Sequence, residues 1–189
     1  MSRELIMILG GVRGGKSSFA LSLAASRGGS VTFVATAEAR DEEMRLRIDE
    51  HRCSRPASWR TVEAPLEPAA ALCQSPPSDI VVLDCLTLLV SNLLLQDEDP
   101  SVAERAVDRE VEGLLRFYQA NLASLIIVSN EVGMGVVPPY ELGRVYRDLL
   151  GRANQRLAQA ADKLYWMLAG LPIEVKASGL TSVSDIVEA

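Results

Sequence analysis

The stretch GGVRGGKSS near the start of the chain holds residues of the types that bind phosphate groups. Gly10 and Gly15 enclose four residues and are followed by Lys16 and Ser17, which is the pattern G-x-x-x-x-G-K-S. In such a loop, backbone N–H groups surround a phosphate, the lysine neutralises its oxygens, and the hydroxyl binds Mg²⁺. The pattern therefore predicts a nucleoside triphosphate site. The predicted loop comprises Gly10, Gly11, Val12, Arg13, Gly14, Gly15, Lys16 and Ser17.

The apolar stretch DIVVLD ends in Asp84, a second candidate for the same site. Proteins with this kind of loop hold the magnesium shell with an acidic residue at the end of another buried strand. A strand-terminal aspartate can instead cap the helix that follows it. Since the loop is present, we favour the magnesium role and predict that Ser17 and Asp84 bind Mg²⁺.

The stretch RIDEHRCSRP contains His51, the one histidine of the chain. If residues 41–52 form a helix, Met44, Ile48 and His51 share one face, and the imidazole looks inward. That helix follows a strand candidate, so its start lies at the carboxyl end of the strand, where ligands bind in open α/β sheets. The helix residues expected to point elsewhere are Glu42, Glu43 and Asp49.

A neutral imidazole beside a triphosphate can attack phosphorus and hold the transferred group as a phosphoramidate. Histidine suits this step because its unperturbed pKa is about 6.5, so the ring is largely deprotonated near neutral pH. Arg52 and Arg55 follow His51 and can bind phosphate oxygens. The alternative is that His51 is an ordinary surface or core residue without a chemical role.

Short apolar stretches alternate with helical ones along the whole chain, and this order predicts an α/β fold. The sheet is expected to be mainly parallel, with about seven strands and helices on both faces. Predicted strands span residues 4–10, 31–36, 79–84 and 124–130, with weaker candidates at 59–64, 163–170 and 172–177. Predicted helices span residues 16–26, 41–52, 66–73, 86–96, 101–122 and 139–160. We expect residues 1–189 to form a single nucleotide-binding catalytic domain.

The composition excludes several classes of protein. Of 189 residues, 48% are hydrophobic and 23% charged, and the net charge is −6, which argues against a nucleic-acid partner. The apolar start is too short for a membrane span or a signal segment. Cys53, Cys73 and Cys85 are widely spaced and odd in number, which fits a reduced cytoplasmic protein without a disulfide framework.

The stretch NEVGMGVVP, residues 130–138, follows a predicted strand and should lie at the same sheet edge as the phosphate loop. One interpretation is a turn that uses the backbone freedom of Gly133 and Gly135. The other is a loop that closes on the nucleotide or on a second substrate. The residues leave both open, and Glu131 is the one to mutate first.

Five stretches together resemble the bifunctional adenosylcobinamide kinase / adenosylcobinamide-phosphate guanylyltransferase family. They are GGVRGGKSSFAL, FVATAEARDEEMRLRIDEHRCSRPASWRTVEAP, VVLDCLTLLVSNLL, VSNEVGMGVVP and GRANQRLAQAADKLYWMLAGLPIEVK, and they cover the chain from about residue 5 to residue 176. The resemblance implies phosphorylation of adenosylcobinamide by a nucleoside triphosphate. It also implies transfer of GMP from GTP, through a GMP–histidine intermediate, to give adenosylcobinamide-GDP and pyrophosphate.

The same resemblance implies roles for individual residues. The histidine that carries GMP falls on His51, and Glu50 stands where some members have a second histidine. A RecA-like sheet and a homotrimer are implied as well. The family's nucleotide contacts beyond the loop fall on Ala35, Thr36, Ala37, Arg52, Cys53, Ser54, Arg55, Glu63 and Asp84.

Two other functions remain as alternatives to the bifunctional transferase. A simple kinase would use the loop and Lys16, with His51 structural. A GTP-dependent switch is disfavoured because the guanine-reading pattern N-K-x-D is absent from the sequence. The sequence leaves open whether ATP or GTP is the phosphate donor in the kinase reaction. It also leaves open how one phosphate loop can serve transfer of the γ phosphorus in one reaction and of the α phosphorus in the other. Our hypothesis is that helix 41–52 moves between the two steps.

Overall fold

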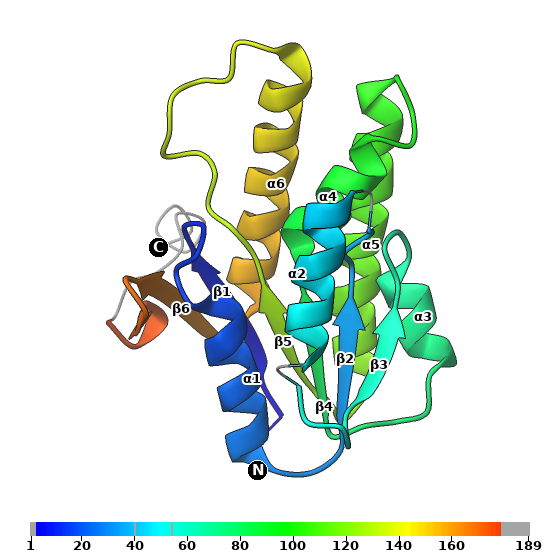
Figure 1. Ribbon diagram of the computed structural model, residues 1–189, viewed down its shortest axis with the longest axis vertical. Coiled ribbons are helices and arrows are strands. Elements are labelled where there is room, and N and C mark those ends of the chain that lie inside the picture. The colour runs from blue at the N-terminus through cyan, green and yellow to red at the C-terminus, as the bar shows by residue number, and fades with distance from the viewer. Residues whose placement is uncertain (1–2, 40, 54, 179–189) are drawn as a thin grey trace, which may run out of the picture.

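The computed structural model describes residues 3–39, 41–53 and 55–178 of the chain (Figure 1). Seven strands in these residues form one sheet in the order β3-β2-β4-β5-β1-β6-β7. The strands are β1 Leu5–Gly10, β2 Val31–Ala35, β3 Arg60–Glu63, β4 Ile80–Asp84, β5 Ser124–Val128, β6 Lys163–Leu168 and β7 Leu171–Glu174. The helices are α1 Lys16–Arg27, α2 Glu42–Cys53, α3 Pro68–Gln74, α4 Leu86–Leu94, α5 Pro100–Ala120 and α6 Glu141–Ala160, and a 3₁₀ turn, η1, spans Lys176–Ser178.

The sheet is parallel except at one edge, which confirms the predicted α/β fold. Strands β1 to β6 pair in parallel, and β7 alone runs antiparallel to its neighbour β6. Ala169 and Gly170 make the tight turn between these two strands with positive φ angles of 49° and 84°. The predicted elements are all present, and their ends shift by up to two or three residues. The antiparallel direction of β7 was not predicted.

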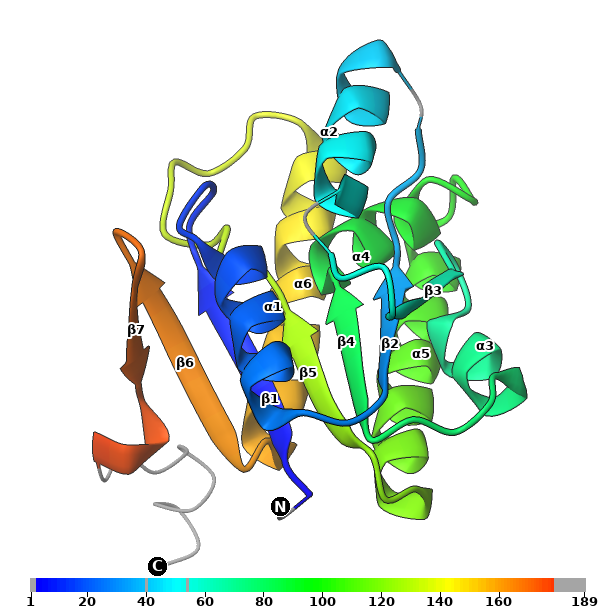
Figure 2. The same ribbon diagram turned by 60° about the horizontal axis from the view of Figure 1, so that its bottom comes forward.

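Alternating side chains of the central strands enter two different cores. Ile6 and Ile8 of β1 pack on the face that α1 covers, where they join Ala20 and Ala24 of that helix. Leu5, Met7 and Leu9 point to the opposite face, which α3, α4, α5 and α6 cover. Figure 2 shows α1 alone in front of the sheet and the larger helical layer behind it. Burial on both faces explains why the strands are apolar throughout.

Helix α2 belongs to neither layer. It stands above the carboxyl ends of the strands (Figure 2), and the helix residues whose exposure is described include no buried side chain. Its first turn is capped by Asp41, whose Oδ1 accepts the Met44 N–H at 2.7 Å. This cap is local to the helix, which meets the sheet near its carboxyl end through the pair of Arg52 with Glu63.

Among the described helices, none is long and apolar enough to cross a membrane.

Candidate active site

The phosphate loop connects β1 to α1 and has the backbone geometry that a phosphate cradle requires. Gly15 precedes the helix with a left-handed φ of 85°, and no side chain caps the helix start. The first N–H groups of α1 therefore remain available to an anion. Gly10 lies so close to β6 that a Cβ atom there would be 2.8 Å from the carbonyl oxygen of Met167. The two glycines are thus needed for different reasons. Gly15 adopts a positive φ angle, and Gly10 lies where β6 leaves no space for a side chain.

Lys16 is held inside the loop. Its residue is 8% exposed, and its Nζ donates to the carbonyl oxygen of Gly11 at 2.6 Å. Burial lowers the pKa of Lys16, while the charges of Cys85 and Asp84 oppose that shift. A partly desolvated ammonium group interacts more strongly with phosphate oxygens than one in water.

Asp84 ends β4, which is separated from the loop strand β1 by β5. Its side chain is 11% exposed and accepts a hydrogen bond from the Ser17 hydroxyl. Burial raises the pKa of Asp84, and Ser17, His51, Arg55 and Lys16 act in the opposite direction. The carboxylate and the first helical hydroxyl therefore lie together, as the sequence predicted for a shared magnesium shell.

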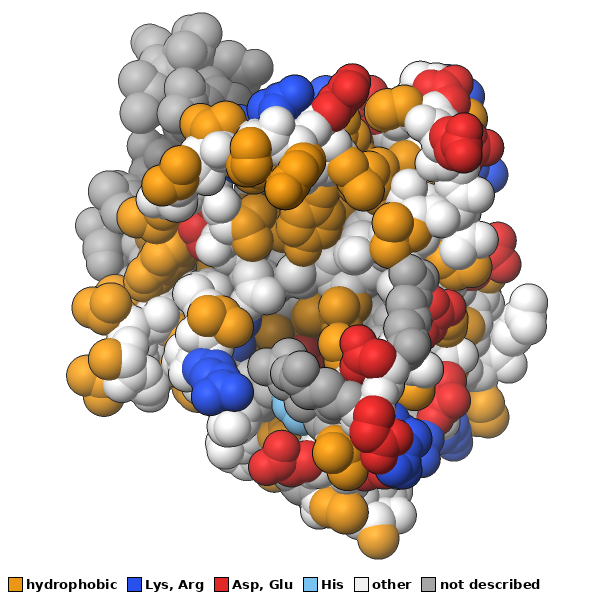
Figure 3. All heavy atoms as spheres, turned by 45° about the horizontal axis from the view of Figure 1, so that its top comes forward, with side chains coloured by type: hydrophobic (Ala, Val, Ile, Leu, Met, Phe, Trp, Pro, Cys, Tyr) orange, Lys and Arg blue, Asp and Glu red, His pale blue; other side chains and the backbone are white. Residues whose placement is uncertain are grey.

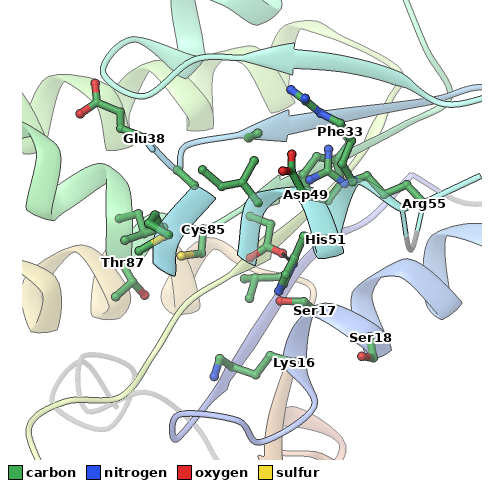
Figure 4. A pocket seen from close by; sticks show the side chains of 18 of the residues that line it. Lys16, Ser17, Ser18, Phe33, Glu38, Asp49, His51, Arg55, Cys85 and Thr87 are labelled. Atoms are coloured by element: carbon green, nitrogen blue, oxygen red, sulfur yellow. Dashed lines mark ion pairs between the residues drawn. The ribbon is translucent and has the colours of Figure 1, made fainter. Parts of the chain in front are cut away.

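His51 reaches from α2 over the end of the loop. Its Nδ1 lies 3.9 Å from Oδ2 of Asp84, and its side chain is 47% exposed. Figure 4 shows the ring directed at the Ser17 hydroxyl. The next residue, Arg52, forms an ion pair with Glu63 at the end of β3. This pair links the carboxyl end of α2 to the sheet beside His51.

Arg55 is positioned by a stacking contact. Its guanidinium carbon lies 3.6 Å from the ring centroid of Phe33, a residue of β2 (Figure 4). Nη1 donates to Thr61 Oγ1 at 3.4 Å, and Nε is buried with no hydrogen-bond partner within the described part of the chain. Burial lowers the pKa of Arg55, although Asp84 opposes the shift. A fixed cation whose donors are incompletely used is suited to bind an anion in the cavity.

These groups line one cavity of about 970 Å³ at the carboxyl edge of the sheet. His51 is among the residues that line this cavity, and apolar side chains show in the interior of the hollow in Figure 3. The sequence-predicted residues that line it are Val12, Arg13, Gly14, Gly15, Lys16, Ser17, Ala35, Ala37, His51, Arg52, Arg55, Glu63 and Asp84. Gly10, Gly11, Thr36 and Cys53 are not among its lining residues. Ser54 lies outside the described residues.

Thr36 is occupied within the protein. It is completely buried, its Oγ1 accepts the Cys85 N–H at 2.8 Å, and its hydroxyl donates to the Cys85 carbonyl at 2.7 Å. The hydroxyl thus connects the carboxyl ends of β2 and β4. Its backbone is used as well, because the Thr36 N–H donates to the Asp84 carbonyl at 3.3 Å and its carbonyl accepts from Asn92 Nδ2 at 2.8 Å.

The expectation that Asp49 points away from the site was wrong. Met44 and Ile48 line the cavity as predicted, but Arg45 and Asp49 line it too. The reason is that α2 borders an open cavity instead of packing on the sheet, so a wider arc of the helix faces it. Arg45 and Asp49 also pair with each other, at 3.5 Å.

Sequence reasoning missed several lining residues from other parts of the chain, among them Phe33, Thr87 and Asn130. Thr87 Oγ1 accepts the Asn130 N–H at 2.8 Å, so the loop after β5 is tied to α4. The one signal in the sequence was that Thr87 and Asn130 are polar residues close to the ends of predicted strands, and this could have marked them as site residues. Glu131 accepts the N–H of Gly133 at 2.5 Å, which supports a local turn at the start of residues 130–138.

The loop, Asp84 and the cavity all lie at one edge of a parallel sheet, which is where α/β proteins bind ligands. The fold and the site therefore define a P-loop nucleotide-binding protein, and the imidazole and cations beside the loop are typical of an enzyme that transfers phosphorus-centred groups.

Comparison with known proteins specifies the class further. The family model described as cobinamide kinase / cobinamide phosphate guanyltransferase matches residues 6–175, and the chain belongs to this family of enzymes. It is 45% identical to the bifunctional adenosylcobalamin biosynthesis protein CobP of Pseudomonas aeruginosa over 175 residues, 92% of this chain and 98% of the relative. It is 38% identical to CobU of Salmonella typhimurium over 181 residues and 37% identical to CobU of Escherichia coli over 182, in each case 91% of this chain and 99% of the relative.

The family assignment confirms the predicted pair of activities. The chain is a kinase that acts on cobinamide and a guanyltransferase that acts on cobinamide phosphate, with nucleotide and corrinoid as its substrates.

Proposed function

We propose that the chain phosphorylates adenosylcobinamide with GTP or ATP and then transfers GMP from GTP through a covalent intermediate on His51. The observation that carries this proposal is the position of the imidazole, with Nδ1 3.9 Å from Asp84 and the ring directed at Ser17 of the phosphate loop. A nucleophile at that place can reach a phosphorus atom of a nucleotide bound by the loop.

In the kinase reaction, Lys16 and the loop N–H groups hold the β and γ phosphates. The substrate hydroxyl attacks the γ phosphorus, the bond from γ phosphorus to the bridging oxygen breaks, and the nucleoside diphosphate leaves. The proton of the hydroxyl passes to a base at the site or to water. Catalysis here consists mostly of positioning and of stabilising negative charge, which the buried ammonium group of Lys16 provides.

In the guanylyl transfer, a ring nitrogen of His51 attacks the α phosphorus of GTP and pyrophosphate leaves. Because Nδ1 lies on the side of Asp84, 3.9 Å from its Oδ2, attack is assigned to the other ring nitrogen, Nε2. A phosphate oxygen of adenosylcobinamide phosphate then attacks the same phosphorus, the P–N bond breaks, and His51 is restored. Two displacements replace one difficult step.

The nucleotide contacts that we propose are Gly10, Gly11, Val12, Arg13, Gly14, Gly15, Lys16, Ser17, Ala35, Thr36, Ala37, Arg52, Cys53, Ser54, Arg55, Glu63 and Asp84. The cavity supports most of them, since the residues of this set that line it come from the loop, β2, α2, β3 and β4. Arg55 is well placed for phosphate oxygens because its stack on Phe33 fixes the guanidinium group.

Mg²⁺ is the proposed metal, and the residues fit it. The Ser17 hydroxyl and the Asp84 carboxylate are hard oxygen ligands that already contact each other, and Mg²⁺ in such sites completes its shell with water and phosphate oxygens. When bound, the ion would neutralise charge on the phosphates.

A movement of α2 would explain how one loop serves two phosphorus atoms. The helix has no described buried side chain, so it can shift without opening a core. We infer that His51 approaches the α phosphorus in one step and withdraws from it in the other.

A labelling experiment tests the proposal. The protein is incubated with GTP radiolabelled at the α or the γ phosphorus and analysed on a denaturing gel. We expect acid-labile, alkali-stable α label on the protein and no γ label. Transfer of γ label to adenosylcobinamide without any α label on the protein would leave a simple kinase with a structural His51.

The assembly and location proposed from the family resemblance are a homotrimer in the cytoplasm, with residues 1–189 as one catalytic domain. Exposed Leu168, Leu171 and Ile173 at the β6–β7 edge are consistent with a subunit contact, and the free cysteines are consistent with a reducing compartment. Light scattering in solution tests the trimer, and a monomeric mass would exclude it.

A further inference from the structure

Asn92 lies in a place where an apolar side chain would be expected. It belongs to α4, is 4% exposed, and is surrounded in that helix by the buried residues Leu89, Val90, Leu93 and Leu94. A buried amide is destabilising unless its hydrogen bonds are made. Packing of the hydrophobic core therefore does not explain why an asparagine occupies this position.

The amide joins two carbonyl groups that lie far apart in the sequence. Its Nδ2 donates to the carbonyl oxygen of Thr36 at 2.8 Å and to that of Pro65 at 3.0 Å. Thr36 follows the last residue of β2, and Pro65 comes two residues after the end of β3. One side chain thus fixes both ends of the chain segment that contains α2.

Only one of these ends leads to His51 by a short route. From Thr36, the chain reaches the amino end of α2, whereas His51 lies in the last turn of that helix. From Pro65, the path leads back two residues to Glu63, whose carboxylate holds Arg52, the neighbour of His51. The Thr36 hydroxyl also bonds both backbone groups of Cys85, next to Asp84. Asn92 therefore links the end of β3, which holds Arg52, to the end of β4, which carries the carboxylate beside the imidazole.

We propose that Asn92 is a positioning residue for guanylyl transfer, which holds the ends of β2 and β3 in place, so that α2 between them brings His51 to the α phosphorus. The proposal rests on the proposed function of His51. Lys16 and Gly15 are held through β1, α1 and the contact of the loop with β6, none of which Asn92 bonds. Loss of the amide should therefore affect guanylyl transfer more than the kinase reaction.

The chain offers a matched control in Asn154. This residue of α6 is 5% exposed, its Oδ1 accepts the Ser129 hydroxyl at 2.7 Å, and its Nδ2 donates to the Asn130 carbonyl at 3.1 Å. It is thus a second buried asparagine that braces a strand end from the same helical layer, but at β5 and away from α2. The variants Asn92→Leu and Asn154→Leu each remove one buried amide.

The experiment measures three quantities for the wild type and both variants. They are the rate of α-label attachment from GTP, the rate of γ transfer to adenosylcobinamide, and the thermal midpoint of unfolding. A misplacement of about 1 Å can lower a reaction rate on the order of 100-fold. We expect Asn92→Leu to lose at least about tenfold in α-label attachment relative to γ transfer. Asn154→Leu should lower the thermal midpoint similarly without that selective loss.

The outcomes separate this inference from the proposed function. Absence of α label on the wild type contradicts the proposed function itself. If the wild type is labelled and Asn92→Leu is labelled equally fast, or loses both activities in the same ratio as Asn154→Leu, Asn92 is only structural. If Asn92→Leu does not fold, Asn92→Ala replaces it, since alanine fits within the space of the asparagine and still removes the amide. The same selective loss is expected there, and an unchanged ratio of rates overturns the proposal.

Discussion

The phosphate loop and helix α2 border the same cavity but are held in opposite ways. The loop is enclosed: Lys16 is buried, Gly10 is in close contact with β6, and α1 anchors the loop to a hydrophobic core. Helix α2 is open to solvent, its cap at Asp41 is local to the helix, and Arg52 in its last turn pairs with Glu63 at the end of β3. In the proposed function, this difference would combine a fixed binding group, used in both reactions, with a nucleophile that only one reaction needs.

The largest expected effect separates these two regions. His51→Ala should abolish attachment of GMP to the protein, because the proposed nucleophile is removed, and should leave γ transfer to adenosylcobinamide intact. The half-exposed ring contributes little to folding, so the free energy of unfolding should change by no more than about 0.5 kcal/mol. Labelling with α- and γ-labelled GTP measures the activities. Glu50→Ala, an exposed neighbour on α2, is the control and should retain both.

Lys16→Ala should damage both reactions instead of one. Removal of a group that stabilises developing charge typically lowers a rate by about 10²–10³-fold, and we expect losses of that order in γ transfer and in GMP attachment. Steady-state kinetics and the labelling assay measure them. Lys163→Ala is the matched control, because that lysine pairs with Glu4 at 3.1 Å at the far end of β1. Retention of GMP attachment by Lys16→Ala would show that the loop does not serve both steps.

A weaker effect is expected from Glu63→Gln, which breaks the pair that attaches α2 beside His51. Both partners of this pair are more than half exposed, and such pairs contribute about 0.2–1 kcal/mol. GMP attachment should therefore slow by about twofold to fivefold, and γ transfer should slow less. The rates of the wild type should approach those of the variant at high salt, because salt screens an exposed pair. Equal slowing of both reactions would contradict a specific attachment of α2.

The smallest effect on activity is expected from Glu4→Gln, at the amino end of the loop strand. The hydrogen bond from Arg27, followed by that from Lys163, lowers the pKa of Glu4. A lowered folded-state pKa means that the stabilisation is present at neutral pH and is lost as the pH falls through that value. The thermal midpoint of the wild type should therefore drop between about pH 5 and about pH 3, and the variant should show a smaller drop. Circular dichroism measures both, and GMP attachment at neutral pH should not change.

Residues close in sequence were predictable and contacts across the fold were not. The loop and the ends of β1 and β4 follow from local patterns, because a strand, glycines and a helix start occupy consecutive positions. The placement of Arg55 on Phe33 could not be predicted, since Phe33 lies in β2 and Arg55 precedes β3, which pairs with β2 only in the folded sheet. The role of Asn92 was not predicted either, because the carbonyls of Thr36 and Pro65 become its neighbours only in the folded sheet. The role of Asp49 was misjudged because periodicity gives the direction of a helix face and not the width of the cavity that it borders.

The most direct test of the account is a mass measurement of the protein after treatment with GTP, followed by peptide mapping. We predict an added mass equal to one GMP, on the peptide that contains His51, and its disappearance when cobinamide phosphate is supplied. A GMP adduct mapped to another residue, or none in a preparation that completes guanylyl transfer, would contradict the central claim that His51 takes the α phosphorus onto its own ring.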